Sequence, residues 1–138
     1  MSPFESFEHM ADVGLRVWAD RLDDLFAEAG RGFLSLLVEN AESVVEAQET
    51  RITVEADRAE DLLLDWLTEL LYRFETDHLL LAGFDVKLCD HRLEARCRGE
   101  TLDWKRHRLQ NEIKAVTYHN LRVEQRDGGW LAEVIFDI

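Results

Sequence analysis

Two amphipathic stripes limit how this chain can fold. Apolar residues recur every three or four positions from Arg21 to about Glu39, and again from Asp57 to about Thr76, which is the spacing of one helix face. Asp20 and Asp57 stand where helix N-caps are expected. Such stripes indicate core-facing helices rather than a cofactor box. The two stripes are Leu22, Leu25, Phe26, Ala29, Phe33, Leu36 and Leu37, and Leu62, Leu63, Trp66, Leu67, Leu70, Leu71 and Phe74.

The segments around these helices are typical of strands. A polar turn is expected at His9–Gly14, and two-residue hairpin turns are expected at Asp90-His91 and around Asp127-Gly-Gly129. The pattern predicts an α+β fold: two amphipathic helices packed on a mostly antiparallel β-sheet, in a single compact domain spanning 1–138. The expected strands are Phe4–Glu8, Leu15–Asp20, one or two within Val44–Ala56, Phe84–Asp90, Arg92–Arg98, Glu112–Gln125 and Trp130–Asp137, with Glu100–His107 a strand or a loop.

The charge balance restricts the partners. Lys and Arg total 16 against 29 Asp and Glu, which gives a net charge of −13. Nucleic-acid binding draws most of its affinity from neutralising phosphates, so a chain this acidic is poorly suited to hold RNA or DNA alone. Anionic membrane surfaces would repel it as well. Metal cations and basic protein surfaces are the expected partners.

The two cysteines are expected to stay reduced. A two-residue turn at Asp90-His91 places Cys89 opposite Arg92 and Cys97 opposite Phe84, so the thiols are not opposite each other. Reduced cysteines and the absence of an N-terminal apolar segment predict a cytoplasmic protein. No apolar run approaches the ~18 residues of a membrane span.

The stretch Glu112-Ile-Lys-Ala-Val-Thr-Tyr-His119 combines strand-forming residues with unusual polar chemistry. In so acidic a chain, Lys114 is a candidate for contact with an anion, although a strand lysine is more often simply solvated. Strand alternation would place Glu112, Lys114, Val116 and Tyr118 on one face. Tyr118 fits a core position and a contact position equally well.

Three acidic groups are candidates for a metal site. The last hairpin brings Asp137 and the α-carboxylate of Ile138 beside the end of the 112–119 stretch, opposite either Asn120 or Tyr118 according to the turn register. Asp12 from the N-terminal turn would complete an oxygen-rich site for Ca²⁺ or Mg²⁺. His9 would support this site by a hydrogen bond to one of the carboxylates. The plain alternatives are ordinary capping by His9 and Asp12, and a chain end without a role.

The predicted strand register of the last hairpin places Lys114 far from this site. Lys114 lies four to six positions beyond either partner of Asp137, which is ~13–20 Å along a straight ladder. Either the sheet curls, or Glu112 and Lys114 face a partner on a different surface from the metal.

Signatures of nucleophilic catalysis are absent from the sequence. It contains no G-x-S-x-G, glycine-rich phosphate loop or C-x-x-C motif. His78 and His91 lie near turns and are expected at the surface. His107 and the segment 107–111 receive no role.

The chain resembles the archease family over nearly its whole length. The resemblance rests on Glu8-His-Met-Ala-Asp-Val-Gly-Leu15, Glu112-Ile-Lys-Ala-Val-Thr-Tyr-His119 and Val134-Ile-Phe-Asp-Ile138, with Gly99-Glu100 between them. It implies a non-catalytic accessory protein of the GTP-dependent RNA ligase that joins 3′-phosphate or 2′,3′-cyclic-phosphate ends to 5′-hydroxyl ends. Such a protein promotes ligase guanylylation and multiple turnover in tRNA splicing and RNA repair, and meets RNA only through the ligase.

The resemblance also implies site residues. Asp12, Asp137 and Ile138 would be the ligands of a divalent metal, commonly calcium, and Lys114 would be the functionally important lysine. Two other functions fit the residues: a metal-dependent phosphoesterase that uses Asp12 and Asp137, with His9 as base, and a generic chaperone-like binding module in which the three motifs are scattered.

Overall fold

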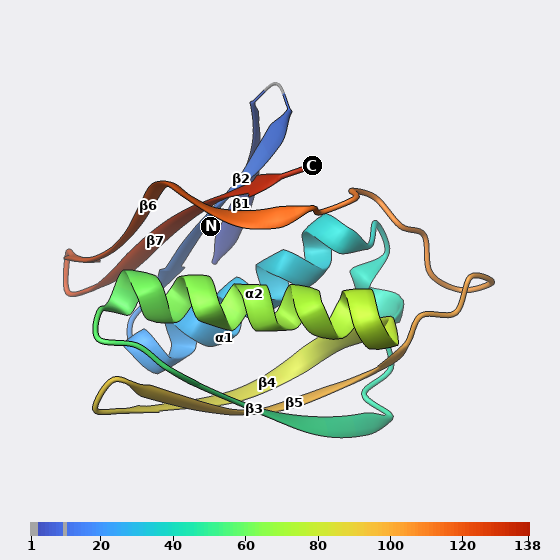
Figure 1. Ribbon diagram of the computed structural model, residues 1–138, viewed down its shortest axis with the longest axis horizontal. Helices are drawn as coiled ribbons and strands as arrows, with labels where there is room; N and C mark the ends of the chain where they lie inside the picture. The colour runs from blue at the N-terminus through green and yellow to red at the C-terminus, as the bar shows by residue number, and fades with distance from the viewer. Residues whose placement is uncertain (1–2, 10) are drawn as a thin grey trace.

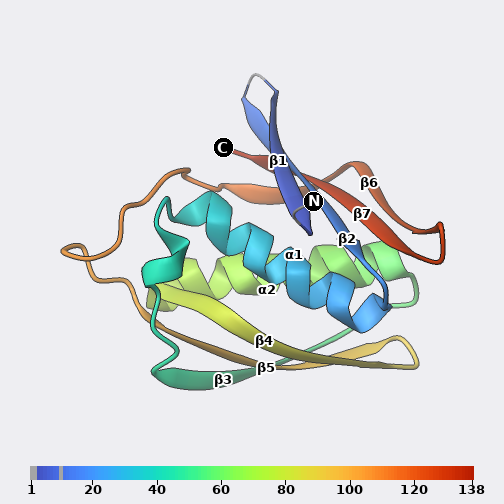
Figure 2. The same ribbon diagram turned by 180° about the vertical axis from the view of Figure 1, so that it is seen from behind.

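The two helices lie between two antiparallel sheets (Figures 1 and 2). The computed structural model describes residues 3–9 and 11–138, apart from the side chains of Glu8 and His9. The strand orders are β1-β2-β7-β6 and β3-β5-β4. The elements are β1 Phe4–His9, β2 Asp12–Ala19, α1 Leu22–Leu37, the 3₁₀ turn η1 Ala41–Ser43, β3 Gln48–Glu55, α2 Ala59–Asp77, β4 Leu79–Cys89, β5 Arg92–Thr101, β6 Ala115–Arg126 and β7 Gly129–Asp137.

This architecture confirms the predicted α+β class, and several element boundaries differ from the prediction. Strand β2 begins at Asp12, so Asp12–Gly14 is strand and not turn. Strand β4 begins at Leu79, five residues before the predicted start. The left-handed backbone of His78 (φ 54°) ends α2 and leads directly into β4. The segment Val44–Ala56 contains one strand, β3.

The predicted helix caps are wrong by one residue. Arg21 and Arg58 occupy the N-cap positions of α1 and α2, and neither side chain makes a capping hydrogen bond. Acidic residues in the first turns favour the positive end of each helix dipole instead: Asp23 and Asp24 in α1, and Glu60 and Asp61 in α2.

Two glycines let α1 approach both sheets closely. A Cβ on Gly30 would lie 2.9 Å from the ring of Phe84 in β4, and one on Gly32 would lie 2.7 Å from Leu15 in β2. The helices are joined by Trp66, whose indole N–H donates to the carbonyl oxygen of Phe26 at 2.9 Å. Since most of both stripes is buried, they form the core as predicted.

The β4–β5 hairpin has the predicted register. Cys89 pairs with Arg92 and Phe84 pairs with Cys97, and both cysteines are free thiols. Burial raises the pKa of the Cys97 thiol to about 12, so this thiol is unreactive. In the described part of the chain, neither helix has the length and apolar character of a bilayer crossing.

Candidate functional site

Three segments far apart in the sequence meet where β7 ends (Figure 1). Asp12, the first residue of β2, is paired directly with Asp137. The backbone N–H of Ile138 donates to the carbonyl oxygen of Ala11 at 3.2 Å. From the other side, the backbone N–H of Lys114 donates to the carbonyl oxygen of Asp137 at 2.8 Å. These residues form what we call the acidic corner: Asp12, Lys114, Asp137 and Ile138.

The two aspartates of the acidic corner share the outer face of the four-stranded sheet. Their neighbours Val13 and Phe136 are buried, so the alternation of side chains directs Asp12 and Asp137 away from the core. Directly opposite residues have Cβ atoms about 4.5–5.5 Å apart, and like charges there repel. A cation beside the pair would stabilise both carboxylates. Oxygen donors of this kind suit a hard divalent ion.

The donor set predicted from the sequence combines two side chains with a main-chain carboxylate. Among the residues whose side chains are described, no three His, Cys, Asp or Glu side chains could jointly hold a metal ion. Of the predicted ligands, the structure places Asp12 directly opposite Asp137, and Ile138 follows Asp137. His9 pairs with Asp12 in the backbone register, but its side chain, which was predicted to support the site, lies outside the described residues.

A bulge in β6 brings Lys114 to the acidic corner. The hairpin turns at Asp127-Gly128, with Arg126 opposite Gly129, which is one of the two registers left open by the sequence. This register holds as far as Arg122 opposite Glu133. Residues 118–121 then bulge out, and the pairing resumes with Thr117 opposite Ile135.

Consequently Ala115 faces Asp137, so the predicted partners Asn120 and Tyr118 are both wrong. The predicted separation of ~13–20 Å between Lys114 and the partner of Asp137 is wrong for the same reason. Lys114 directly precedes the residue that is paired with Asp137.

The predicted alternation holds for Glu112, Ile113 and Lys114 and fails at Val116, because β6 begins only at Ala115. Ile113 and Val116 both pack against the core, whereas Glu112 and Lys114 are exposed. Glu112 and Lys114 line a surface groove of about 500 Å³. Its other side is formed by Phe74 and Glu75 at the end of α2. The expected pairing of Glu112 with Lys114 on one exposed surface is therefore present, next to the acidic corner.

Further along the outer face, Glu133 joins two arginines. Its carboxylate accepts hydrogen bonds from Arg16 at 2.7 Å and Arg122 at 2.6 Å. Burial opposes the charge of Glu133, but these bonds outweigh it and hold the pKa of the carboxyl below its ordinary value. Beside this cluster, the ring of Phe7 lies over Gly14, where a Cβ would be 2.0 Å from the ring. The sequence predicted a turn at Gly14, whereas the structure requires glycine there for this close contact.

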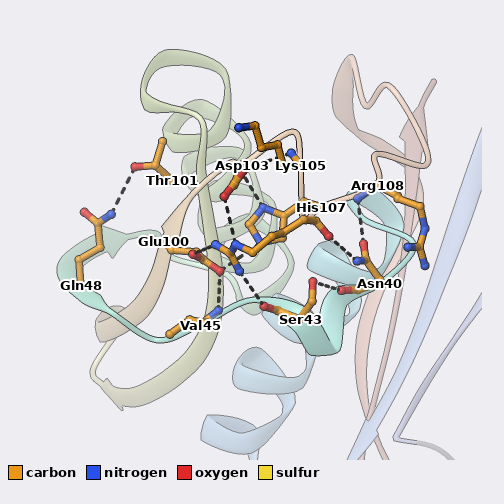
Figure 3. A network of polar contacts seen from close by, with 11 residues as sticks. Asn40, Ser43, Val45, Gln48, Glu100, Thr101, Asp103, Lys105, His107 and Arg108 are labelled. Carbon is orange, nitrogen blue, oxygen red and sulfur yellow. Dashed lines mark hydrogen bonds and ion pairs between the residues drawn. The ribbon is translucent and has the colours of Figure 1, made fainter.

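A buried polar network, missed in the sequence, holds the loop that leads to Lys114 (Figure 3). The side chain of His107 is fully buried, and its Nε2 lies 3.0 Å from Oε2 of Glu100. The backbone N–H of Asp103 donates to Nδ1 of His107 at 2.9 Å. Since Nδ1 accepts, the ring is neutral and Nε2 is the nitrogen that donates to Glu100. His107 therefore connects the end of β5 to the loop that follows it.

Glu100 is the centre of this network. Its carboxylate also accepts from the backbone N–H of Val45 at 2.7 Å and from the guanidinium of Arg106. The hydrogen bond from Arg106, with those from Val45 and His107, lowers the pKa of Glu100 from 4.5 to about 2, against the effect of burial. The carboxylate thus stays charged throughout the physiological pH range.

Tyr118, in the bulge of β6, is exposed and is therefore not a core residue. Its side chain is 66% exposed, and its hydroxyl donates to Asp61 of α2 at 3.2 Å. The negative charge of Asp61 raises the pKa of Tyr118. Burial, and then the charge of Asp61, raise the pKa of Asp65 one helical turn further on. The bulge therefore lies beside an acidic part of α2.

A surface hollow larger than the groove beside Lys114 lies elsewhere. It measures about 780 Å³ and surrounds the β4–β5 turn, with Cys89, His91 and Asp57 among its lining residues. None of the predicted site residues is part of it. His91 and His78 are exposed, as predicted.

The fold and the acidic corner define a class of small α+β proteins in which an N-terminal hairpin, a C-terminal strand and a lysine-bearing segment converge. The model of the Archease protein family (MTH1598/TM1083) matches residues 4–138. Protein archease of Methanopyrus kandleri is 39% identical over 140 residues, covering 99% of both chains. Protein archease of Pyrococcus abyssi is 33% identical over 143 residues, covering 100% of both. This chain belongs to the archease family.

Solved structures agree with this assignment. The solution structure of protein 1598 of Methanobacterium thermoautotrophicum superimposes with a TM-score of 0.88 at 31% identity, covering 100% of both chains. The crystal structure of an archease from Thermotoga maritima gives a TM-score of 0.67 at 20% identity, over 97% of this chain and 96% of that one. The second likeness concerns the fold alone.

Proposed function

We propose that this protein is a non-catalytic activator of a GTP-dependent RNA ligase of the kind that joins 3′-phosphate or 2′,3′-cyclic-phosphate ends to 5′-hydroxyl ends. In this role it promotes guanylylation of the ligase and its multiple turnover in tRNA splicing and RNA repair. It meets RNA through the ligase. Two free thiols are compatible with a reducing compartment such as the cytoplasm.

One observation carries the proposal: Asp12, Lys114 and Asp137 converge at one corner of the molecule. Each comes from a different one of the three motifs that resemble the archease family. In a generic binding module these motifs would have no reason to meet. Asp12 and Asp137 lie on an open sheet face, and Lys114 lies at an open surface groove. This openness favours docking against another protein over independent catalysis in an enclosed cleft.

Within this proposal, Asp12, Asp137 and the α-carboxylate of Ile138 hold a divalent cation, with calcium the favoured ion. The ion would neutralise the like charges and fix the β1–β2 hairpin against the end of β7. The carboxylates orient the corner, and Lys114 supplies a positive group beside it. Such a group can contact an anionic phosphate or carboxylate at the ligase active site, where charge changes during guanylylation.

The test is guanylylation of the purified ligase with GTP, with and without the accessory protein. We expect Asp12→Ala, Asp137→Ala and Lys114→Ala each to reduce the stimulated rate by about 10- to 100-fold, the usual cost of losing a positioned charged group. A two-residue extension after Ile138, which removes the α-carboxylate from its position, should have the same effect. Isothermal titration with Ca²⁺ should show weaker binding for the two aspartate variants and for the extended protein.

Matched controls lie on the other side of the molecule. Lys87→Ala in β4 and Asp57→Ala before α2 remove the same groups from exposed positions and should leave stimulation intact. Full stimulation by all three corner variants would contradict the proposal. Chelator-sensitive phosphoesterase activity of the isolated protein, lost in Asp12→Ala, would instead favour a metal-dependent hydrolase.

A further inference from the structure

The loop between β5 and β6 carries the most exposed large hydrophobic side chain of the described residues. Trp104 is 73% exposed. The loop projects beyond the layers of the fold at one end of the molecule (Figures 1 and 2). An exposed tryptophan contributes nothing to the core, and exposure of its apolar ring to water is unfavourable. Its position therefore points to a role outside the fold.

This loop is held rigidly, although it projects. Asn40, itself buried, donates from Nδ2 to the carbonyl oxygen of Arg106 at 2.7 Å, and its Oδ1 accepts from the backbone N–H of Arg108 at 2.9 Å. On the other side of Trp104, the backbone N–H of Lys105 donates to Asp103 at 2.9 Å. With the buried His107, these bonds hold the backbone before and after Trp104 in the sequence. Figure 3 shows the side chains that make them. A side chain presented in this way loses little entropy when it binds.

The charges around Trp104 differ from those of the whole chain. Lys105, Arg106 and Arg108 follow it within four residues, in a chain of net charge −13. Arg106 is engaged with Glu100 and Asp103. Arg108 is 65% exposed and lies only loosely near Glu39, at 3.8 Å. Lys105 and Arg108 are both exposed and thus provide two cationic groups close to Trp104 in the chain.

We propose that Trp104 is the anchor of a second docking surface, which inserts into an apolar pocket rimmed by carboxylates on a protein partner. Tryptophan and arginine are the residues most enriched among interface hot spots. The inference rests on the proposed function in taking that partner to be the RNA ligase. An RNA strand fits less well, because only two cations remain for phosphates and the rest of the molecule repels a polyanion.

The experiment measures the dissociation constant of the full-length protein and the purified ligase by biolayer interferometry. We expect Trp104→Ala to weaken binding by about tenfold or more. Trp104→Phe should recover part of the loss, and Lys105→Glu with Arg108→Glu should also weaken binding. The double charge reversal Lys87→Glu with Arg51→Glu, on the outer face of the three-stranded sheet, is the control and should bind normally. Because Trp104 is exposed, its variants should melt at the wild-type temperature.

Guanylylation at saturating accessory protein separates the two proposals. Trp104→Ala should reach the wild-type rate at saturation, whereas Asp137→Ala should stay slow. Wild-type affinity of Trp104→Ala for the ligase would overturn the docking surface and leave the activator role standing. Loss of affinity for a short single-stranded RNA, with ligase affinity unchanged, would overturn it in favour of an RNA contact.

Discussion

At the scale of single residues, the most informative contact is the one between His107 and Glu100. The sequence alone does not predict that either side chain is buried. A glutamate, and an isolated histidine in a stretch of charged residues, are normally solvated. Their environment depends on Val45 and Asn40, which lie more than fifty residues earlier in the chain. The sequence contains no local signal for such a contact, so His107 could not be assigned.

Glu100→Gln tests how much this contact stabilises the protein. Loss of the charge weakens the bonds from Arg106, Val45 and His107 together, and hydrogen bonds to charged groups contribute about 1.5–3 kcal/mol. We expect the free energy of unfolding in urea to fall by about that amount. Glu49→Gln is the control, because its pair with Arg96 is more exposed and should change stability by under about 1 kcal/mol.

The same variant predicts a pH effect. The folded pKa of Glu100 is about 2 against an ordinary value of 4.5. Because the pKa is lowered in the folded protein, Glu100 contributes to the free energy of unfolding above pH 4.5. This contribution is lost as the pH falls towards 2. Urea midpoints of the wild type should therefore decline over this window, and those of Glu100→Gln should decline less. Parallel curves for the two proteins would contradict the assignment.

At the scale of elements, the two long hairpins show how far a turn determines the register of the strands that it joins. The two-residue turn at Asp90-His91 fixes the β4–β5 register across the cysteines, although one irregularity follows between Leu81 and Gly83. The turn at Asp127-Gly128 fixes the β6–β7 register equally well, but only as far as Arg122. Beyond Arg122, a bulge shifts the register of the remaining pairs. The approach of Asp12 to Asp137 was predictable from the motifs, whereas the position of Lys114 was not.

Asn120 is the one residue of the bulge with a recognisable signal. Its backbone is left-handed (φ 53°), a conformation that asparagine tolerates and alanine does not. We expect Asn120→Ala to lower the free energy of unfolding by about 1 kcal/mol, and Asn120→Gly to stay close to the wild type. Hydrogen exchange of the Lys114 amide, which is bonded to Asp137, should accelerate in Asn120→Ala. Gln125→Ala, at a regular position of β6, is the control for both measurements.

At the scale of the whole molecule, the negative charge is unevenly distributed. The strands β3, β4 and β5 carry five acidic and five basic residues, whereas α1 and α2 carry nine acidic and two basic. The exposed side of α2 includes Asp65, Tyr72 and Glu75. Figure 1 shows α2 in front of α1 and next to β6. Tyr118 of the β6 bulge is bonded to Asp61 of α2. Lys114 shares a groove with Glu75. A basic partner is thus attracted towards the side of the molecule that bears the proposed site.

Charge reversal on α2 checks this attraction. We expect Asp65→Lys with Glu75→Lys to slow association with the ligase by about tenfold at low salt, and much less at high salt, because screening removes steering. Glu49→Lys with Glu94→Lys changes the net charge equally on the balanced sheet and should slow association less. Equal effects of the two pairs would show that net charge alone, and not its position, governs the encounter.

The bulge of β6 has a consequence for self-association as well. β6 is an edge strand of its sheet, and an edge strand offers unpaired N–H and C=O groups to which a strand of another molecule can add. Residues 118–121 interrupt that row, so a foreign strand could pair with only a short part of it. The irregularity that brings Lys114 to its place thereby also hinders the growth of intermolecular sheets and fibrils.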